Sequence, residues 1–247
     1  MEEILLIDNS NTRTKFCLLS RMGENAVHCL PTQDLSVASI LDAVKDWSFS
    51  RVVLCSVVPE AACKLRAAFN QPVISLSSDI AGLKVDFSHY LGRNTLGADR
   101  VANVLGLAAA YPVPAVAVDM GTAVTFDVVT PAPDASLRFR GGAITPGLQT
   151  LCQSLHHSTA LLPSVQRQQC SSCVGQTTQE AIWGGCSIGF CAMVRGVLQQ
   201  IERELGCKPY VVATGGDAAW AAALIPEIDT VAPMLTLSGL AFFAQTL

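Results

Sequence analysis

One short polar segment combines an acid, amides, hydroxyls and two cations: Asp8, Asn9, Ser10, Asn11, Thr12, Arg13, Thr14 and Lys15. Apolar runs on both sides predict a β-hairpin that carries this segment at its tip. Such a mixture suits nucleotide phosphates. A carboxylate can hold magnesium, N–H groups and hydroxyls can contact phosphate oxygens, and a lysine can neutralise developing charge. An ordinary polar turn is the alternative.

The same pattern returns about half a chain later, at residues 115–122. A buried strand ends in Asp119 and leads into Gly121 and Thr122. Gly121 permits close approach of a ligand to the backbone, and the Thr122 hydroxyl could meet a phosphate. This second tip therefore strengthens the interpretation of the first as a phosphate-binding element.

This internal repeat of the hairpin pattern predicts two similar lobes, residues 1–113 and 114–247, that face one another across a nucleotide cleft. Strand-like runs alternate with helix-like runs, which favours mixed α/β layers. We expect a long helical region over residues 175–205. Its buried face is expected to carry Ile182, Cys186, Gly189, Met193 and Val194.

Residues 97–100, Gly-Ala-Asp-Arg, open a predicted helix and place Asp99 in its first turn. One interpretation is that Asp99 complements the helix dipole. The other is a general base: a carboxylate beside Arg100 stays ionised and accepts a hydroxyl proton, while the arginine binds a substrate carboxylate or phosphate. Spacing alone leaves both open.

Two glycine-rich segments are weaker signals. Residues 214–216, Thr-Gly-Gly, follow a predicted strand in the second lobe, where a nucleotide-binding protein needs its adenosine site, although such a sequence is often only a turn. Residues 141–147 predict a third glycine-rich turn between a strand and a helix, and its structural interpretation is at least as good as a functional one.

Composition excludes several classes of function. Half of the residues are hydrophobic and 15% are charged, so the chain is expected to be globular. The formal charge of −4, without a cluster of Lys and Arg, argues against nucleic acid as a partner. No apolar run approaches the roughly 20 residues that span a bilayer, and we expect neither a membrane segment nor a signal peptide.

Ten cysteines scattered through apolar stretches fit reduced thiols in the cytoplasm better than disulfides. The one close pair is Cys170 and Cys173. It resembles half a zinc or redox site but has no second pair to complete it, so a metal or redox function is not expected.

Together these motifs resemble the type III pantothenate kinases of the actin/sugar-kinase/Hsp70 superfamily, over nearly the whole chain. The family's Asp-x-Gly-Asn-Thr-x-x-Lys, Gly-x-Asp-Arg and Asp-x-Gly-Thr-Ala motifs are similar to residues 8–15, 97–100 and 119–123, in the same order. The resemblance implies an α/β fold of two ribonuclease-H-like lobes with mixed sheets. The implied activity is the ATP-dependent phosphorylation of pantothenate to 4'-phosphopantothenate, the first step of coenzyme A biosynthesis.

The resemblance also implies roles for single residues. Asp99 is the implied general base, and Asp119 the implied ligand of a monovalent cation, K⁺ or NH4⁺, that acts besides Mg²⁺. ATP is bound by residues 8–15 and Thr122. Pantothenate is bound by Tyr90, Gly97, Ala98, Arg100 and, across a homodimer interface, Thr178.

The sequence departs from the family pattern at two places. Ser10 replaces a glycine in the first motif, and Gly92-Arg93 replaces the Asn-Pro that usually follows the tyrosine. Two other functions remain open. One is a noncatalytic member that acts as an accessory binding protein in gene regulation, and the other is an enzyme of the same fold with another small substrate.

Overall fold

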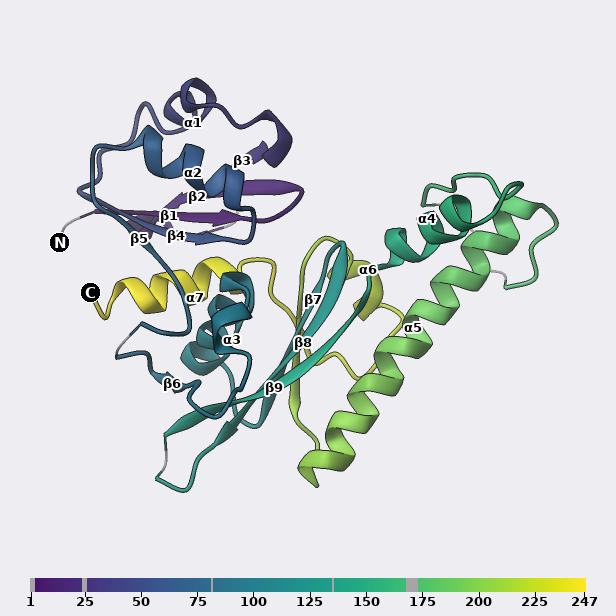
Figure 1. The fold of residues 1–247 in the computed structure, drawn as a ribbon. Coiled ribbons are helices and arrows are strands. Elements are labelled where there is room, and N and C mark those ends of the chain that lie inside the picture. Colours follow the sequence, from purple (N-terminus) through teal and green to yellow (C-terminus); the bar gives the residue numbers. More distant parts are fainter. Residues whose placement is uncertain (1–2, 24–25, 81, 135, 168–172) are drawn as a thin grey trace. The chain divides into compact units, whose positions relative to one another are not determined.

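The computed structural model describes residues 3–23, 26–80, 82–134, 136–167 and 173–247, which form an α/β fold with two sheets (Figure 1). The chain divides into two compact units. The first comprises Met1–Ala115, Asp127–Gly141 and Met234–Leu247, and the second comprises Val116–Phe126 and Gly142–Pro233. The first unit therefore includes the C-terminal helix, which the predicted boundary assigns to the second lobe.

The sheet of the first unit has five strands in the order β3-β2-β1-β4-β5. Their bounds are β1 (Ile4–Asn9), β2 (Arg13–Leu18), β3 (His28–Pro31), β4 (Arg51–Ser56) and β5 (Val73–Ser75). β1 and β2 form the predicted antiparallel hairpin, with Asp8 opposite Lys15, and β1 pairs with β4 in parallel. β1 is buried along its whole length, as its continuous apolar run predicts for a central strand.

Helices cover both faces of this sheet. α1 (Val37–Ala43) and α2 (Pro59–Ala68) lie on one side, while α3 (Ala98–Ala110) and α7 (Leu235–Ala244) pack on the other (Figure 1). The core on the α1 and α2 side gathers large apolar side chains, among them Leu5, Ile7, Phe16, Ile40 and Leu65. Three-residue 3-10 helices occur at Leu19–Arg21, Thr32–Asp34 and Arg93–Thr95.

α3 and α7 cross with their backbones in close contact because each has a glycine at the crossing. A Cβ on Gly106 would lie 2.6 Å from the Leu235 carbonyl, and a Cβ on Gly239 would clash with the Ala102 carbonyl. The Thr236 hydroxyl also donates to Asn103 Oδ1 at 2.9 Å between the two helices. The C-terminal helix thus fixes α3, whose second residue is Asp99.

The second sheet has the strand order β11-β10-β7-β8-β9-β6. Its strands are β6 (Val85–Asp86), β7 (Ala115–Met120), β8 (Ala123–Pro131), β9 (Leu137–Pro146), β10 (Tyr210–Thr214) and β11 (Thr230–Val231). β7 and β8 confirm the second hairpin. The predicted turn at residues 141–147 was wrong, since β9 continues to Pro146 and Gly147 is the N-cap of α4 (Leu148–Ser158).

The predicted long helix is α5 (Thr178–Leu205). It begins with a capping box, in which the Thr177 hydroxyl accepts from the Glu180 N–H and the Glu180 carboxylate accepts from the Thr177 N–H, and it ends at Gly206 with φ 70°. Gly189, expected on the buried face, is exposed instead. Rings of Trp183 and Phe190 pack against Trp220 of the short helix α6 (Ala218–Ala222).

By length and composition alone, α5 could cross a membrane, and it is the one such helix in the part of the chain that the structure describes. Arg195 interrupts the apolar residues of α5, so the expectation that no uninterrupted apolar run approaches roughly 20 residues holds for this helix. One third of its most apolar stretch is buried within the protein, and a core helix passes the same test. The test is thus weak evidence for a membrane span.

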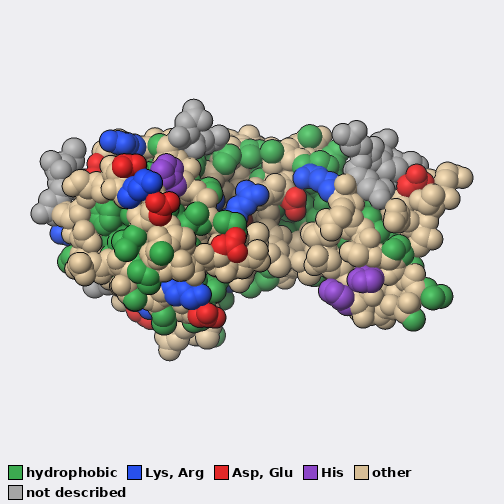
Figure 2. All heavy atoms as spheres, turned by 90° about the horizontal axis from the view of Figure 1, so that it is seen from above, with side chains coloured by type: hydrophobic (Ala, Val, Ile, Leu, Met, Phe, Trp, Pro, Cys, Tyr) green, Lys and Arg blue, Asp and Glu red, His purple; other side chains and the backbone are tan. Residues whose placement is uncertain are grey.

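Charged side chains of both signs are interspersed on the face seen in Figure 2, where Lys and Arg lie beside Asp and Glu.

Candidate active site

The hairpin tip between β1 and β2 places a carboxylate against an ammonium group. Asp8 is 5% exposed, and its Oδ2 accepts a hydrogen bond from Lys15 Nζ at 3.1 Å. Ser10 closes the turn, because its backbone N–H and its hydroxyl both donate to the Arg13 carbonyl at 3.0 Å. The side chain that replaces the family's glycine is therefore part of the turn itself.

Two of the predicted phosphate-binding side chains are engaged in packing the tip onto the sheet. Asn9 donates to Thr14 Oγ1 at 2.8 Å and accepts from the Ser56 hydroxyl at 2.6 Å. Thr14 is fully buried and also lies 3.1 Å from the Thr32 hydroxyl. Because these side chains are paired and buried, residues 11–13, which are exposed, are better placed to meet a ligand.

Asp99 is the second residue of α3, as predicted, and its carboxylate folds back over the start of the helix. Asp99 Oδ1 accepts a hydrogen bond from the Arg100 N–H at 2.8 Å. A Cβ on Gly97, the N-cap residue, would clash with this Oδ1. Glycine at position 97 therefore leaves the space that the carboxylate occupies.

Burial is the main cause that raises the pKa of Asp99 above its ordinary value. The hydrogen bond from the Arg100 N–H acts in the opposite direction, and the nearby negative charge of Asp8 raises the pKa further. The sequence-based argument considered only groups that favour the ionised form, and burial outweighs them. A carboxylate with a raised pKa accepts a proton more readily than an ordinary aspartate, which suits a general base.

Arg100 is held in place by a buried acid. Its Nη2 and Nε both lie 2.7 Å from Oδ1 of Asp127, a residue of β8 that is fully buried. The Arg100 guanidinium carbon lies 5.8 Å from the centroid of the Phe139 ring, and Arg100 forms a hydrogen bond with Tyr90. The structure thus brings together the predicted substrate residues Tyr90 and Arg100.

Tyr90 packs between aromatic and backbone groups. Its ring centroid lies 5.1 Å from that of Phe139, and a Cβ on Gly141 would lie 3.5 Å from the ring. Gly141 has φ 94°, a conformation that favours glycine in the middle of a strand. Glycine is therefore favoured here by its backbone conformation, since a Cβ would meet the ring at ordinary van der Waals distance.

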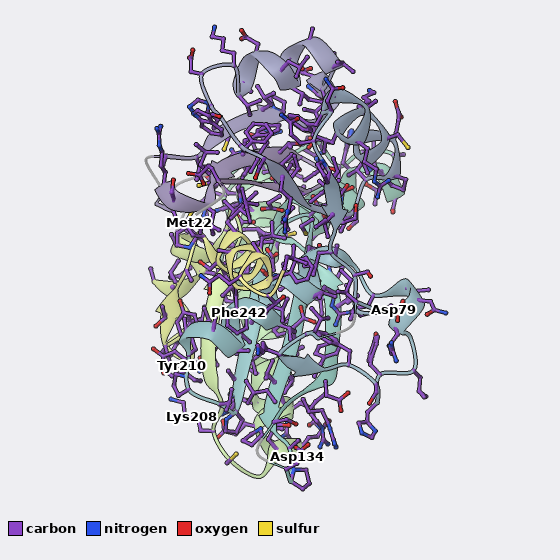
Figure 3. The ribbon with its side chains drawn as sticks, turned by 90° about the vertical axis from the view of Figure 1, so that its left-hand side faces the viewer. Met22, Asp79, Asp134, Lys208, Tyr210 and Phe242 are labelled. Atoms are coloured by element: carbon purple, nitrogen blue, oxygen red, sulfur yellow. The ribbon has the colours of Figure 1, made fainter. Side chains whose placement is uncertain are left out.

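The loop after Tyr90, which lacks the family's proline, is tied by side-chain contacts. Arg93 Nη2 forms an ion pair with Asp79 Oδ1 at 2.7 Å, and the Ser78 hydroxyl donates to the Arg93 carbonyl at 3.0 Å. Figure 3 shows Asp79 on a loop at the edge of the view. These contacts restrain the loop where the family uses a proline.

The second hairpin tip is supported from beneath by the start of α4. The Thr122 carbonyl accepts from the Gly147 N–H at 3.0 Å and from the Thr150 hydroxyl at 2.6 Å. A Cβ on Gly147 would clash with the Gly121 carbonyl. Gly147 therefore allows the start of α4 to pack against the hairpin tip. The glycine-rich residues before it belong to strand β9.

The Thr-Gly-Gly segment after β10 lies against the acidic end of β7. Gly215 has φ 93°, and a Cβ there would lie 2.7 Å from Asp119 Oδ1. The Asp217 N–H donates to the Met120 carbonyl at 3.2 Å. The candidate adenosine segment and the candidate cation ligand are thus in direct contact.

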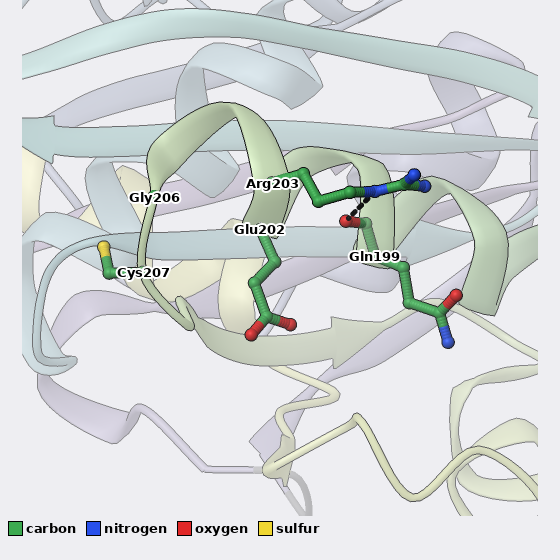
Figure 4. Close-up of a pocket in the computed structure, with 5 residues that line it drawn as sticks. All are labelled: Gln199, Glu202, Arg203, Gly206 and Cys207. Atoms are coloured by element: carbon green, nitrogen blue, oxygen red, sulfur yellow. Dashed lines mark hydrogen bonds between the residues drawn. The ribbon is translucent and has the colours of Figure 1, made fainter.

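Thr178, the remaining predicted substrate residue, is the first residue of α5 and is exposed. At the other end of this helix lies a surface pocket of about 470 Å³ (Figure 4). It is lined by Gln199, Glu202, Arg203, Gly206 and Cys207, and Arg203 Nε donates to the Gln199 carbonyl. None of the predicted site residues lines this pocket.

Single carboxylates, rather than a cluster of ligands, are the groups that could hold Mg²⁺ and a monovalent cation. Among the described residues, no three His, Cys, Asp or Glu side chains gather as a metal site, and Cys170 lies outside the described residues. Magnesium bound to a nucleotide keeps water and phosphate oxygens as ligands, so one carboxylate such as Asp8 is sufficient. Asp119 offers a carboxylate to a monovalent cation, and hard cations prefer such oxygen ligands.

Sequence reasoning missed Asp127 and assigned Gly141 to a turn. Asp127 lies within the apolar strand β8, and an acid at such a position needs a buried partner. That signal was present in the sequence, although the identity of the partner was not. Gly141 was noticed, but its role beside Tyr90 depends on a contact between distant segments.

Comparison with known proteins gives the family. Residues 4–200 match the family model for type III pantothenate kinase. A protein from Akkermansia muciniphila, named type III pantothenate kinase, is 42% identical over 240 residues that cover 96% of each chain. Proteins of the same name from Methylacidiphilum infernorum and Gluconobacter oxydans are 34% and 31% identical.

Solved structures confirm the predicted fold class. A Baf family transcriptional activator from Campylobacter jejuni aligns with a TM-score of 0.63 and 20% identity, over 98% of this chain and 100% of that one. A glucokinase from an Antarctic psychrotroph aligns over all of both chains with a TM-score of 0.52 and 11% identity. These likenesses show an α/β fold of the actin/sugar-kinase/Hsp70 type. With the family match over residues 4–200, the chain belongs to the type III pantothenate kinase family.

Proposed function

We propose that this protein transfers the γ-phosphoryl group of ATP to the 4'-hydroxyl of pantothenate, with Asp99 as the general base. The observation that carries this proposal is the half-buried Asp99 carboxylate, which has a raised pKa and lies at the start of α3 next to Arg100. Family membership supplies the substrate, since the relatives are named pantothenate kinases.

In the proposed reaction, the 4'-oxygen attacks the γ-phosphorus and the bond from that phosphorus to the β,γ-bridging oxygen of ATP breaks. The hydroxyl proton passes to the Asp99 carboxylate, and ADP leaves with the bonding electrons. Positioning and charge neutralisation supply most of the rate enhancement in such transfers. Tyr90, Gly97, Ala98 and Arg100 are the proposed pantothenate contacts in the same part of the chain.

Both hairpin tips are proposed to bind ATP, the first through residues 8–15 and the second through Thr122. The ion pair of Asp8 with Lys15 supports this, because it keeps an acid for magnesium and a cation for phosphate at one place. When bound, Mg²⁺ would neutralise phosphate charge. Asp119 is the proposed ligand of K⁺ or NH4⁺, and the close packing of Gly215 supports a fixed position for its carboxylate.

The proposed assembly is a homodimer in which Thr178 reaches the partner's pantothenate. The exposed side of α5 supports this arrangement, since it carries Ile188 at 47% exposure and three glycines whose Cβ positions meet nothing within 4 Å: Gly185, Gly189 and Gly196. An apolar helix face with small residues suits close packing against another helix.

The predicted lobes, 1–113 and 114–247, and a cytoplasmic location remain part of the proposal. The echo of hairpin β1-β2 in hairpin β7-β8 supports the lobes. Free thiols on the cysteines among the described residues support a reducing compartment.

The proposal is tested by incubating purified protein with ATP, Mg²⁺ and K⁺, with and without pantothenate, while measuring ADP release and the mass of the product. We expect pantothenate-dependent ADP release and a product heavier by one phosphoryl group. Replacement of K⁺ by Na⁺ should reduce the rate if Asp119 holds the cation. No turnover under any condition would contradict the proposal and favour the accessory binding function.

Turnover with glucose or acetate instead of pantothenate would favour an enzyme of the same fold with another substrate.

A further inference from the structure

We infer that Asp127 is a positioning residue for substrate binding, which orients the Arg100 guanidinium so that its remaining N–H groups meet the carboxylate of pantothenate. The inference rests on the proposed function. It assigns a role to Asp127, which lies outside the motifs from which that function was proposed.

The first argument is the geometry of the pair. Arg100 Nε and Nη2 both lie 2.7 Å from the same oxygen, Asp127 Oδ1, so a whole edge of the guanidinium plane is fixed. A guanidinium has five N–H groups in a rigid fork, and pairing one edge with one oxygen leaves donors for a second carboxylate. The acid therefore sets the direction in which those donors point.

The second argument is burial. Asp127 is fully buried, Arg100 is 7% exposed, and the Phe139 ring that lies near the guanidinium is 1% exposed. Burying either charge without a partner would be costly, so each holds the other in this position. The Tyr90 hydroxyl, which is bonded to Arg100, extends the fixed group to a predicted substrate residue.

The net charge of the pair separates an orienting role of Asp127 from a purely electrostatic one. Asp127 cancels the positive charge of Arg100, so the pair presents directed hydrogen-bond donors to the substrate with little net charge. If orientation governs binding, neutralising Asp127 weakens the binding of pantothenate even though it leaves an uncompensated positive charge near an anionic ligand. If charge alone governs binding, the same change strengthens it. The two cases therefore predict opposite changes.

A merely structural role is the competing explanation, since the pair also joins β8 to the start of α3. The alcohol analogue of pantothenate, in which CH2OH replaces the carboxylate, separates the two roles. Loss of orientation at Arg100 affects the carboxylate substrate selectively, whereas a displaced Asp99 affects both substrates equally.

The experiment measures KM and kcat for both compounds with wild type, Asp127→Asn and Asp127→Glu. We expect Asp127→Asn to raise the KM for pantothenate about tenfold or more, the loss expected for one hydrogen bond to a charged group. The values for the alcohol analogue should change much less, and Asp127→Glu should recover part of the loss. Equal changes for both compounds, or an unchanged or lower KM for pantothenate, would overturn the inference.

Asp127→Asn could leave Arg100 buried without its partner and fail to fold. The pair of variants Arg100→Gln and Arg100→Gln/Asp127→Asn avoids a lone buried arginine. The double variant buries no charge, and in Arg100→Gln the buried Asp127 carboxyl can take up a proton instead of remaining charged. If Asp127 acts only through Arg100, both have the same KM for pantothenate. A further large increase in the double variant would overturn the inference.

Glu227→Gln is the matched control, since it breaks another Arg–carboxylate pair, with Arg195 Nε at 2.9 Å, outside the proposed site. The KM and kcat of Glu227→Gln for both compounds should equal those of wild type. If wild type turns over pantothenate and Asp127→Asn has the same KM for it, the inference is overturned but the proposed function is not. No wild-type turnover of pantothenate would overturn the proposed function, and the inference with it.

Discussion

At the scale of single residues, the environment of Asp99 raises its pKa, and the raised pKa affects both its chemistry and the free energy of unfolding. Its native pKa is raised, so the folded protein binds the Asp99 proton more strongly than the unfolded chain does. The free energy of unfolding therefore decreases as the pH rises from about 3.9, the ordinary aspartate value, through the native pKa. The destabilisation is complete only at pH values above the native pKa of Asp99.

Asp99→Asn should consequently raise the melting temperature at pH 7. The gain should disappear below about pH 4, where the aspartate is protonated in both states. Thermal unfolding of both proteins between about pH 3 and pH 8 measures this. A lower melting temperature of the variant at pH 7, or a difference that does not change with pH, would contradict the raised pKa.

Gly97→Ala should lower kcat strongly, because the new Cβ would clash with Asp99 Oδ1 and force the carboxylate to move. A misplaced general base costs on the order of 100-fold in rate. Gly23→Ala is the control, since a Cβ there meets nothing within 4 Å. An unchanged kcat in a folded Gly97→Ala protein would show that the carboxylate does not need this position.

Sequence alone predicted the residue types of the site but not how they pair. Asp8, Asp99 and Asp119 were identified because each ends a strand or opens a helix. The pairing of Arg100 with Asp127 was not, because it joins a helix to a strand 27 positions away in the chain, and sequence periodicity carries no information on such contacts.

At the scale of elements, the crossing of α3 and α7 positions the candidate base. α3 was predicted from the sequence, but the glycines that let it touch α7 were not recognised. The segment 141–147 was misread for a related reason. Its glycines indicated a turn, whereas Gly141 supplies a positive φ within β9 and Gly147 supports the second hairpin tip. Glycine alone does not distinguish a turn from a close contact.

Gly239→Ala should destabilise the protein by about 1–3 kcal/mol, because its Cβ would overlap the Ala102 carbonyl and force the helices apart. Denaturant unfolding measures this change. Gly196→Ala in α5 is the matched control, since its Cβ meets nothing and alanine favours the helix. Equal stability of the two variants would contradict the close crossing.

At the scale of the whole molecule, alternating strand-like and helix-like runs predicted mixed α/β layers, the family resemblance implied the fold class, and the solved structures confirm it. The division into compact units did not follow from the same pattern. Helix α7 belongs to the first unit although it ends the chain, because its partners β1 and α3 lie there. An internal repeat indicates two halves but not where a final helix packs.

The proposed homodimer predicts that Ile188→Glu on α5 produces a monomer, because a carboxylate would be buried at the interface. Light scattering after gel filtration should change from twice the chain mass of 26.1 kDa to that mass. Val37→Glu on α1 is the control, since Val37 is 43% exposed and Ile188 is 47% exposed. A dimer that persists in Ile188→Glu would exclude this face as the interface.

The most direct test of the central claim is pantothenate-dependent ADP release by wild type and Asp99→Asn, each shown to be folded by its thermal unfolding. The account predicts turnover by wild type and a decrease in kcat of roughly 100-fold to 10,000-fold in the variant, the range for loss of a general base. A folded Asp99→Asn protein that turns over at a rate near that of wild type would contradict it.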